Sequence, residues 1–544
     1  MLTWIRNIFQ PPVEAEPAAV PAHSQTAAAA NPSQPSSTVS ATPMQRGTAF
    51  LMDAQLEEAA ACFRQALQEN PQDADAHFAL GIVFNEQGQK DEASKALEAA
   101  IRCDPKLVDA HHMLGAILLE QGDLKGAIQK FKDAIEIKDD FDLAYRDLCR
   151  ALFQDGQHES AKQAVLKGIA LNPSIPDFHN YLGNLHFSAN EFSQAAACYR
   201  TALSIDPELA PAYANLGNSL LALGKPDEAA PYYKNALSRN PKNLHANLTL
   251  GKILLDQGDK AGAAPCYRNA LAIDNNLTDA HQYLGNILVS EGKIEEAVAC
   301  YRQVERLDPA NDGIRHLIAA LTGQSPERGS PYYVERLFDD YAGHFDSHLV
   351  KKLGYQAPEK FVEMICQVST VGDRKWDVLD LGCGTGLVGL AIAPYANQIV
   401  GVDLSPKMLE KARERALYAR LAHADLLAMM QGESASSYDV VIAADVFVYV
   451  GKLEEIFAEA KRLLRLGGLF VFSVESLEHS IEQGVETNTP GFRLASTARF
   501  QHSCDYLEKL AAGNGFTNVE KLLTHVRTDK DKPIPAWFTL WRAG

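Results

Sequence analysis

Residues 378–386 read Val-Leu-Asp-Leu-Gly-Cys-Gly-Thr-Gly, an apolar run that ends in an acid and is followed by three glycines at alternate positions. The apolar run is typical of a buried strand, and the glycines predict a turn in which the backbone bends sharply. A helix is expected from about Leu387, with its free N–H groups and its positive dipole end facing any ligand at the turn. The stretch therefore predicts a strand, turn and helix that together hold a nucleotide-like cofactor.

Three segments after this turn read as further strands, and each ends in an acid. They are QIVGVD at 398–403, RLAHAD at 420–425 and YDVVIAAD at 438–445. Ligands of doubly wound sheets bind outside the carboxyl ends of the parallel strands. We therefore expect four carboxylates along one edge of a single sheet, from Asp380, Asp403, Asp425 and Asp445.

The motifs DLGCGTG, GVDLS, HADL, YDVVIAADVFVYV and LLRLGGLFVFSVE occur in this order over roughly residues 375–475. They resemble the class I S-adenosylmethionine-dependent methyltransferases. The resemblance implies an α/β, Rossmann-like domain with a seven-stranded, mostly parallel sheet. A dehydrogenase is the main alternative, because residues 384–389 (GTGLVG) also satisfy the dinucleotide pattern G-x-G-x-x-G. A dehydrogenase has no obvious need for an acid after the third strand, so methyl transfer is favoured.

The resemblance also implies a set of residues that hold the cofactor S-adenosylmethionine. They are Asp380, Gly382, Cys383, Gly384, Gly386, Asp403, Leu404, Met408, Asp425, Leu426 and Tyr341. The glycines would hold the methionine part, and Asp403 would accept both ribose hydroxyls. Met408 would lie against the adenine, Asp425 would accept from its amino group, and Leu426 would supply a backbone N–H. Tyr341 would wall the pocket from an N-terminal lid. Cys383 is expected to be a small apolar filler rather than a nucleophile.

A longer resemblance includes segments outside the central sheet. They are the lid at 332–349 (YYVERLFDDYAGHFDSHL), FRL at 492–494, RFQHS at 499–503 and VR at 526–527. Behind a helical repeat array, this combination resembles the bacterial predicted methyltransferases that carry tetratricopeptide repeats, over most of the chain after residue 40. The sequence departs from that pattern at Thr528, where an acid would be expected. The resemblance does not imply a particular methyl acceptor.

Candidate catalytic residues follow from the expected position of the acceptor, beyond Asp445. His502 is the preferred general base, because imidazole titrates near neutral pH. Asp445 could instead be the base or only a structural cap, and Tyr449 is suited to wall the pocket. Arg493 or Arg499 could hold a carboxylate or phosphate of the substrate. No metal site is expected, since the nine cysteines show no metal-ligand spacing.

Glycine, alanine and proline each recur every 34 residues in the first half of the chain. Examples are Gly81 and Gly115, Ala93 and Ala127, and Pro71 and Pro105. This period predicts tetratricopeptide repeats, an all-α solenoid of helix–turn–helix units. The expected segments are a short apolar segment at 1–10, a disordered Ala/Pro/Ser-rich tether at 11–39, eight repeats at 40–311, a capping helix and linker at 312–330, and the methyltransferase domain at 331–544.

The repeat groove is expected to bind a protein or peptide partner. Asn184, Asn218 and Asn286 recur at one repeat position and could form a ladder of amides that faces a bound backbone; the alternative is that asparagine is simply common there.

Composition narrows the functions further. The net charge of -18 disfavours a broad grip on nucleic acid. The fourth strand is followed by VFVY at 446–449 rather than an Asn/Asp-Pro-Pro-aromatic tetrapeptide, so methylation of nucleobases is not expected. Unpaired cysteines fit a reducing compartment, and no apolar run approaches a membrane span, so we expect a cytoplasmic protein.

Three functions stay open from the sequence. The first is a methyltransferase whose repeats recruit a protein partner or substrate. The second is a small-molecule oxygen or carboxyl methyltransferase that its repeats place in an assembly. The third is a scaffold that binds the cofactor without reacting.

Overall fold

The structure is a computed structural model that describes residues 41–351, 354–369, 375–482, 491–529 and 532–544. The predicted apolar segment at 1–10 and the predicted tether at 11–39 lie outside the described residues. The chain divides into two compact units, residues 1–257 and 258–544, which are described separately.

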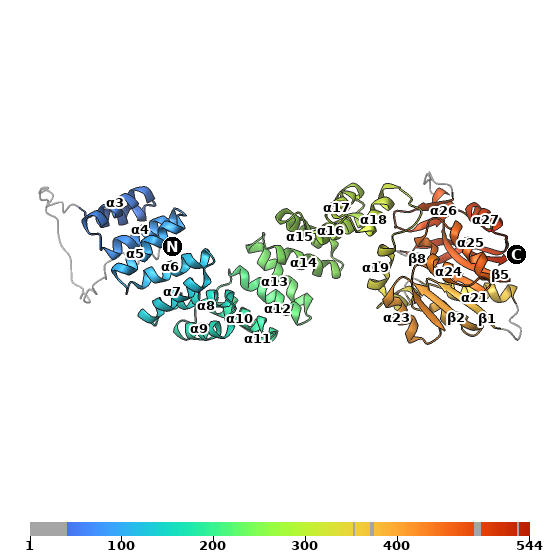
Figure 1. Cartoon of the computed structure of the whole chain (residues 1–544), viewed down its shortest axis with the longest axis horizontal. Helices are drawn as coiled ribbons and strands as arrows, with labels where there is room; N and C mark the ends of the chain where they lie inside the picture. Colours follow the sequence, from blue (N-terminus) through green and yellow to red (C-terminus); the bar gives the residue numbers. More distant parts are fainter. Residues whose placement is uncertain (1–40, 352–353, 370–374, 483–490, 530–531) are drawn as a thin grey trace, which may run out of the picture. The chain divides into compact units, whose positions relative to one another are not determined.

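The first unit is a stack of short helices joined by tight turns (Figure 1). Its helices are α2 (Pro43–Met52), α3 (Leu56–Glu69), α4 (Ala74–Glu86), α5 (Lys90–Cys103), α6 (Val108–Glu120), α7 (Leu124–Ile137), α8 (Asp142–Gln154), α9 (His158–Leu171), α10 (Pro176–Ser188), α11 (Phe192–Ile205), α12 (Ala210–Ala222), α13 (Pro226–Arg239) and α14 (Leu244–Asp256). The second unit begins with α15 (Lys260–Ile273), α16 (Thr278–Ser290), α17 (Ile294–Leu307) and α18 (Asp312–Thr322). Together they confirm a helical repeat array.

Glycine recurs in the repeats because two helices touch there. A Cβ added at Gly183 would lie 2.5 Å from the ring of Tyr199 on the next helix, closer than a real methyl group can approach. The same aromatic position explains the asparagine ladder. The Tyr199 hydroxyl donates to Asn184 Oδ1 at 2.8 Å, and equivalent bonds join Tyr233 to Asn218 and Tyr301 to Asn286. These amide oxygens are therefore used inside the repeats, which favours the structural interpretation of the ladder.

The rest of the second unit is an α/β domain. Its helices are α19 (Pro331–Tyr341), α20 (Phe345–Lys351), α21 (Ala357–Val368), α22 (Leu387–Ile392), α23 (Pro406–Glu414), α24 (Leu426–Gly432), the 3-10 helix η1 (Phe447–Tyr449), α25 (Glu454–Leu463), α26 (Leu477–Glu482) and α27 (Cys504–Gly513). Its strands are β1 (Trp376–Leu381), β2 (Ala396–Asp403), β3 (Arg420–His423), β4 (Tyr438–Ala443), β5 (Leu464–Ser476), β6 (Phe492–Leu494), β7 (Phe500–His502), β8 (Phe516–Asp529) and β9 (Lys532–Ala543).

The sheet runs in the order β3-β2-β1-β4-β5, with these five strands parallel. Strand β9 pairs antiparallel with β5, and β8 pairs antiparallel with β9, which completes the expected seven-stranded, mostly parallel sheet. A short hairpin, β6–β7, extends from the carboxyl end of β5. The predicted fold class is confirmed, and the hairpin is an addition to the predicted sheet.

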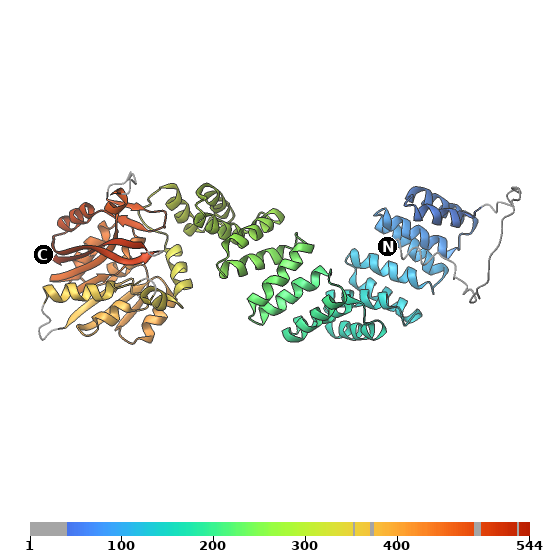
Figure 2. The same ribbon diagram turned by 180° about the vertical axis from the view of Figure 1, so that it is seen from behind.

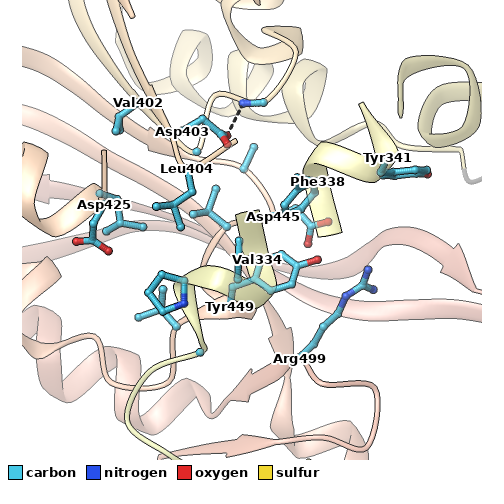
Figure 3. A pocket seen from close by; sticks show the side chains of 18 of the residues that line it. Val334, Phe338, Tyr341, Val402, Asp403, Leu404, Asp425, Asp445, Tyr449 and Arg499 are labelled. Atoms are coloured by element: carbon cyan, nitrogen blue, oxygen red, sulfur yellow. Dashed lines mark hydrogen bonds between the residues drawn. The ribbon is translucent and has the colours of Figure 1, made fainter. Parts of the chain in front are cut away.

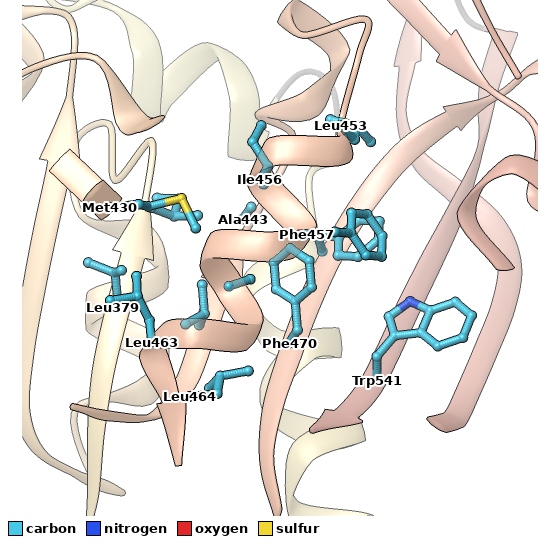
Figure 4. Packing of buried hydrophobic residues seen from close by; sticks show 14 of the residues in the cluster. Leu379, Met430, Ala443, Leu453, Ile456, Phe457, Leu463, Leu464, Phe470 and Trp541 are labelled. Atoms are coloured by element: carbon cyan, nitrogen blue, oxygen red, sulfur yellow. The ribbon is translucent and has the colours of Figure 1, made fainter. Parts of the chain in front are cut away.

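Hydrophobic side chains cover both faces of this sheet, as the near-continuous apolar strands require. Helices α24, α25 and α27 pack on one face, where Phe457 and Phe470 are fully buried and Trp541 joins them from β9 (Figure 4). Helices α21 and α22 pack on the other face around Phe361. Figure 2 shows the domain from behind, with helices against the sheet. The sheet is therefore buried on both faces between helices.

Helix α18 packs directly on the β6–β7 hairpin. Ala319 and Ala320 contact a cluster that contains Phe492 and Phe500, and His316 Nε2 donates to the carbonyl of Ala498 at 3.0 Å. The Ser330 hydroxyl donates to Asp312 Oδ1 at 2.7 Å and caps α19 by accepting from the Tyr333 N–H. The helix expected to close the repeat array is therefore also a packing element of the α/β domain.

Candidate active site

A cavity of about 260 Å³ opens at the carboxyl ends of the central strands (Figure 3). Its lining includes Gly382 and Gly384 after β1, Asp403 at the end of β2 and Leu404 after it, Asp425 and Leu426 after β3, Asp445 and Tyr449 after β4, Tyr341 on α19, and Arg499 before β7. The structure thus brings together ten of the residues that the sequence analysis singled out. The strand order explains this, because parallel strands end at one edge of the sheet.

Asp403 is held by the backbone of the glycine turn. Its Oδ2 accepts from the Gly384 N–H at 2.9 Å, and its Oδ1 accepts from the Ser405 N–H at 2.8 Å. Burial raises the pKa of Asp403, although these backbone N–H groups oppose the shift. Each carboxylate oxygen can accept a second hydrogen bond, so the group can also serve two hydroxyls of a ligand in the cavity.

The glycine turn leaves room for a ligand only on its cavity side. Gly382 has φ +65°, and a Cβ there would lie 2.5 Å from Val446. Gly384 has φ +52° and no atom within 4 Å of its would-be Cβ, although it lines the cavity. A side chain at Gly384 would therefore fill space that a ligand could occupy.

We expect Gly384→Ala to weaken binding of S-adenosylhomocysteine at least 10-fold, because the added methyl group enters the cavity. Isothermal titration of the full chain measures this. Gly88→Ala is the matched control, since Gly88 in a repeat turn also has positive φ (+76°) and open space around it. It carries the same backbone strain of about 1–2 kcal/mol and should leave binding unchanged. Equal affinities for all three proteins would contradict a ligand at this turn.

Asp425 is both a helix cap and a cavity residue. Its Oδ1 accepts from the N–H groups of Leu427 and Ala428 at 3.0 and 3.1 Å, which caps α24. Both bonds use the same oxygen, so Oδ2 can accept from an amino group. Figure 3 places Leu404 between Asp403 and Asp425, where it offers an apolar surface.

Helix α19 forms a lid over the cavity. Val334 and Phe338 line it from this helix, and Asp339 Oδ1 accepts from the Ser405 hydroxyl at 2.6 Å. The ring of Phe338 also meets Tyr449 edge-on at 5.4 Å. The lid is therefore fixed on both sides of the cavity, and its aromatic side chains keep water away from the interior.

Two arginines and two acids form a cluster at the β4–β5 end of the cavity, in which Arg527 and Glu475 are buried and Arg499 and Asp445 are partly exposed. Arg527, 2 % exposed, donates to Asp445 and to Glu475 Oε1, the latter at 2.6 Å. Arg499 lies 3.7 Å from the same Glu475 oxygen. Burial raises the pKa of Glu475, while Arg527 and Arg499 oppose the shift. Asp445 holds a left-handed backbone, φ 60°, which costs about 1–3 kcal/mol and directs the acid at the end of β4.

Four of the predicted cofactor residues lie outside the cavity lining. Met408 is fully buried at the first turn of α23, where its N–H is capped by Ser405, so it does not line the cavity, whereas Leu404 and Leu426 do. Cys383 and Gly386 are buried within the turn and do not line the cavity. The burial of Cys383 agrees with its expected role as a small apolar filler.

Asp380 also lies behind the turn, but it has an unused oxygen. Its Oδ2 accepts from the Tyr418 hydroxyl at 2.7 Å, and burial raises its pKa to about 7. Among the described residues, Oδ1 has no hydrogen-bond partner.

His502 does not reach the cavity, contrary to the prediction that it is the general base. Its side chain is fully buried in β7, and Nε2 donates to the Gly451 carbonyl at 2.8 Å. Burial lowers its pKa to about 4. A neutral histidine that supports the hairpin explains this geometry. Arg493 lies in β6 and is likewise absent from the cavity lining, so only Arg499 of the two candidate arginines is placed to meet a substrate.

His502 should make the fold sensitive to acid. Because its folded pKa of about 4 lies below the 6.5 of an unfolded histidine, the unfolded chain binds the extra proton between these values. The stability that neutral His502 contributes is fully present above pH 6.5. It is lost as the pH decreases toward 4, and the free energy of unfolding falls by about 2 kcal/mol between pH 7 and pH 5. Urea unfolding at both pH values, compared with His502→Gln, isolates this loss. An equal loss in both proteins would contradict it.

Several cavity residues were missed by the sequence analysis. They are Arg328, Val334, Phe338, Phe345, Tyr355, Val446 and Arg527. The lid motif contains Val334, Phe338 and Phe345, and the dipeptide at 526–527 contains Arg527, so the resemblance carried a signal that was not assigned to the site.

Comparison with known families identifies the two parts of the chain. A model described as a methyltransferase domain matches residues 378–468, and tetratricopeptide repeat models match segments between residues 44 and 324. The chain carries a methyltransferase domain behind tetratricopeptide repeats. The matched domain contains the glycine turn and the acids at 403, 425 and 445 that line the cavity.

Curated relatives similar to part of this chain include several methyltransferases. A malonyl-[acyl-carrier protein] O-methyltransferase of Legionella pneumophila is 37% identical over 145 residues, 26% of this chain and 49% of that protein. A sterol 4-C-methyltransferase of Caenorhabditis elegans is 27% identical over 164 residues, 28% of this chain and 48% of that protein. The chain spans about half the length of these relatives.

Solved structures similar to part of this chain include two helical proteins. The tetratricopeptide protein YrrB, described as having an unusual peptide-binding site, is 22% identical with a TM-score of 0.31, covering 34% of this chain and 96% of that one. Pseudomonas aeruginosa pilF is 19% identical with a TM-score of 0.35, covering 39% and 96%.

The described residues contain neither a group of side chains arranged to hold a metal ion nor a helix long and apolar enough to cross a bilayer.

Proposed function

We propose that this protein transfers a methyl group from S-adenosylmethionine to an acceptor that is still to be identified, and that its repeat array binds a partner or substrate protein. The observation that carries the proposal is the pair of carboxylates, Asp403 and Asp425, on one cavity wall beside the open face of Gly384. An adenosine presents two ribose hydroxyls and one amino group, which are the donors that these acids can accept.

The residues present fit S-adenosylmethionine. Asp403 would hold the ribose, Asp425 the adenine amino group and the Gly382–Gly384 backbone the methionine part. When bound, the cofactor supplies an activated methyl group. The protein would then have to hold the acceptor in line and keep water out, and the apolar lid side chains Val334 and Phe338, which line the cavity, would help to exclude water.

Other functions make different demands on this cavity. Hydride transfer with a nicotinamide dinucleotide would use Asp403 on a ribose but gives Asp425 no clear role. A small-molecule methyltransferase placed in an assembly by its repeats uses the same cavity, and so does a scaffold that binds the cofactor without reacting.

Two measurements separate these functions. Isothermal titration with S-adenosylhomocysteine and with NADH tests the cofactor: binding of the first alone supports the proposal, and binding of NADH alone overturns it. Incubation of cell extract with methyl-labelled S-adenosylmethionine, followed by separation of protein from small molecules, then shows which class accepts the label. Cofactor binding without any transfer would favour the scaffold.

A further inference from the structure

The acceptor side of the cavity can be located from the strand order. Asp425 and Asp403 follow β3 and β2, and the glycine turn follows β1, so the adenosine and methionine parts of the cofactor would span these three strands. Beyond β1 the sheet continues with β4 and β5. Asp445 and Arg499 lie there, which places the acceptor between the turn and Arg499.

Arg499 differs from its neighbour Arg527 in how much of its charge is already used. Arg527 is bonded to two carboxylates and is 2 % exposed. The side chain of Arg499 is 30 % exposed, and its nearest carboxylate oxygen lies at 3.7 Å, beyond hydrogen-bond distance. Figure 3 shows Arg499 directed toward the cavity below Tyr341 and Asp445. Arg499 is hydrogen-bonded to the Tyr449 side chain, and its remaining guanidinium N–H groups can donate to an anion of the acceptor, such as a carboxylate.

The cavity offers little to remove a proton from an acceptor. The described lining contains no histidine, lysine or cysteine. Asp445 is already held by Arg527. One relay is present, since the Tyr341 hydroxyl is hydrogen-bonded to His348 Nδ1. A hydroxyl or amine acceptor would depend on this relay, whereas a carboxylate is already ionised near neutral pH and needs no base.

The positive charge of the cofactor also favours an anionic acceptor, because the protein cluster beside it is neutral. Arg499 and Arg527 balance Asp445 and Glu475, so the cluster has no net formal charge. A carboxylate acceptor would then face the single positive charge of a sulfonium in a cavity walled by Phe338 and Tyr449. Opposite charges attract strongly in such a low-dielectric site.

We propose that the methyl acceptor is the carboxylate of an apolar or aromatic carboxylic acid, held by Arg499, and that the product is a methyl ester. This inference rests on the proposed function. A carboxylate oxygen forms the new bond to the methyl carbon, the sulfur–methyl bond breaks, and its electron pair stays on sulfur. No proton is released or taken up, and the anion and sulfonium become a neutral ester and a neutral thioether.

The binding test uses probes of matched shape. Phenylacetate and phenylacetamide are titrated into the full chain saturated with sinefungin, a cofactor analogue that carries an amine in place of the methylated sulfonium. We expect phenylacetate to bind at least 10-fold more tightly than the amide, and Arg499→Gln to remove this preference. Equal affinities of wild type for both probes would overturn the proposal, because the Arg499 site would then not recognise a carboxylate.

The transfer test uses the chemistry of the product. Label transferred from methyl-labelled S-adenosylmethionine into extract should be released as volatile methanol at alkaline pH. Methyl esters are hydrolysed to methanol under these conditions, whereas methyl amines and methyl ethers are stable. Arg499→Gln should lower this release at least 100-fold with S-adenosylhomocysteine affinity changed less than 3-fold. Arg413→Gln, at an exposed site on α23, is the matched control and should behave as wild type.

Three results would contradict the proposal while leaving the methyltransferase intact. The first is label that is stable to alkali. The second is a 100-fold loss of transfer in His348→Gln, which would show that a proton must be removed. The third is weakened S-adenosylhomocysteine binding in Arg499→Gln, which would assign this arginine to the carboxylate of the cofactor. Failure of the wild type to bind S-adenosylhomocysteine would instead reject the proposed function itself.

Discussion

Replacing Asp403 with asparagine should weaken binding of S-adenosylhomocysteine about 100-fold or more. Hydrogen bonds to a charged acceptor contribute about 1.5–3 kcal/mol each, and the carboxylate would accept two ribose hydroxyls in addition to the N–H groups of Gly384 and Ser405. An amide keeps only one acceptor oxygen, so both the ribose contacts and the turn lose a partner. Isothermal titration of the full chain measures the change.

Two further variants interpret this result. Asp425→Asn should cost only about 10-fold, because its Oδ1 can still cap α24 and one contact to the adenine is affected. Asp505→Asn, in the first turn of α27 and away from the cavity lining, should leave affinity unchanged. Unaltered affinity in Asp403→Asn would remove the basis for placing an adenosine along these strands.

Replacing Arg527 with methionine should destabilise the α/β domain by about 3–5 kcal/mol. The substitution leaves Glu475, 5 % exposed, and Asp445 without their buried partner, and an uncompensated buried charge costs this much. Three of the four tryptophans, Trp376, Trp537 and Trp541, lie in this domain, so fluorescence-monitored urea unfolding reports on it.

The double variant Glu475→Gln/Arg527→Met is the control for that result. Neutralising the partner acid removes part of the stranded charge, so the double variant should be more stable than Arg527→Met alone. If both proteins unfold at the same urea concentration, the ion pair does not explain the loss of stability. The same pair of variants separates folding from function, since a folded double variant can be tested for cofactor binding.

The segment between the repeats and the sheet contributes to the cavity. Helix α18, which follows the repeats, contacts the hairpin that carries Arg499, and Ser330 links it to the lid helix α19. The residues between the repeats and the sheet therefore form part of the cavity, as the lining by Arg328 and Pro331 shows. A methyltransferase domain cut at the start of its sheet would lack this wall.

The central site was predictable because its signals are local. A glycine turn after an apolar strand and acids at strand ends depend on residues next to each other in the chain, and parallel strands bring those ends to one edge. The sequence accordingly predicts the positions of Asp403, Asp425, Asp445 and Gly384 at this edge. Met408 was misplaced because the rotation of α23 about its axis, which buries that side chain, is set by packing rather than by spacing.

The hairpin residues could not be assigned from the sequence. In Phe500-Gln501-His502 the alternation spans only three residues, so nothing local shows which face is buried. The structure buries Phe500 and His502 together beside α18 and η1, while Arg499, just before the strand, reaches the cavity.

By itself the sequence determined a repeat solenoid followed by a Rossmann-like sheet with a cofactor edge, because periodicity, glycines and strand-end acids are short-range features. Only the tertiary structure decided which charged groups meet at the acceptor end. Arg527 on β8 reaches Asp445 after β4, 82 residues away in the chain, because β8 pairs with β9 and β9 pairs with β5, a strand more than 60 residues before it. Such pairings depend on the packing of the whole sheet, which no single segment encodes.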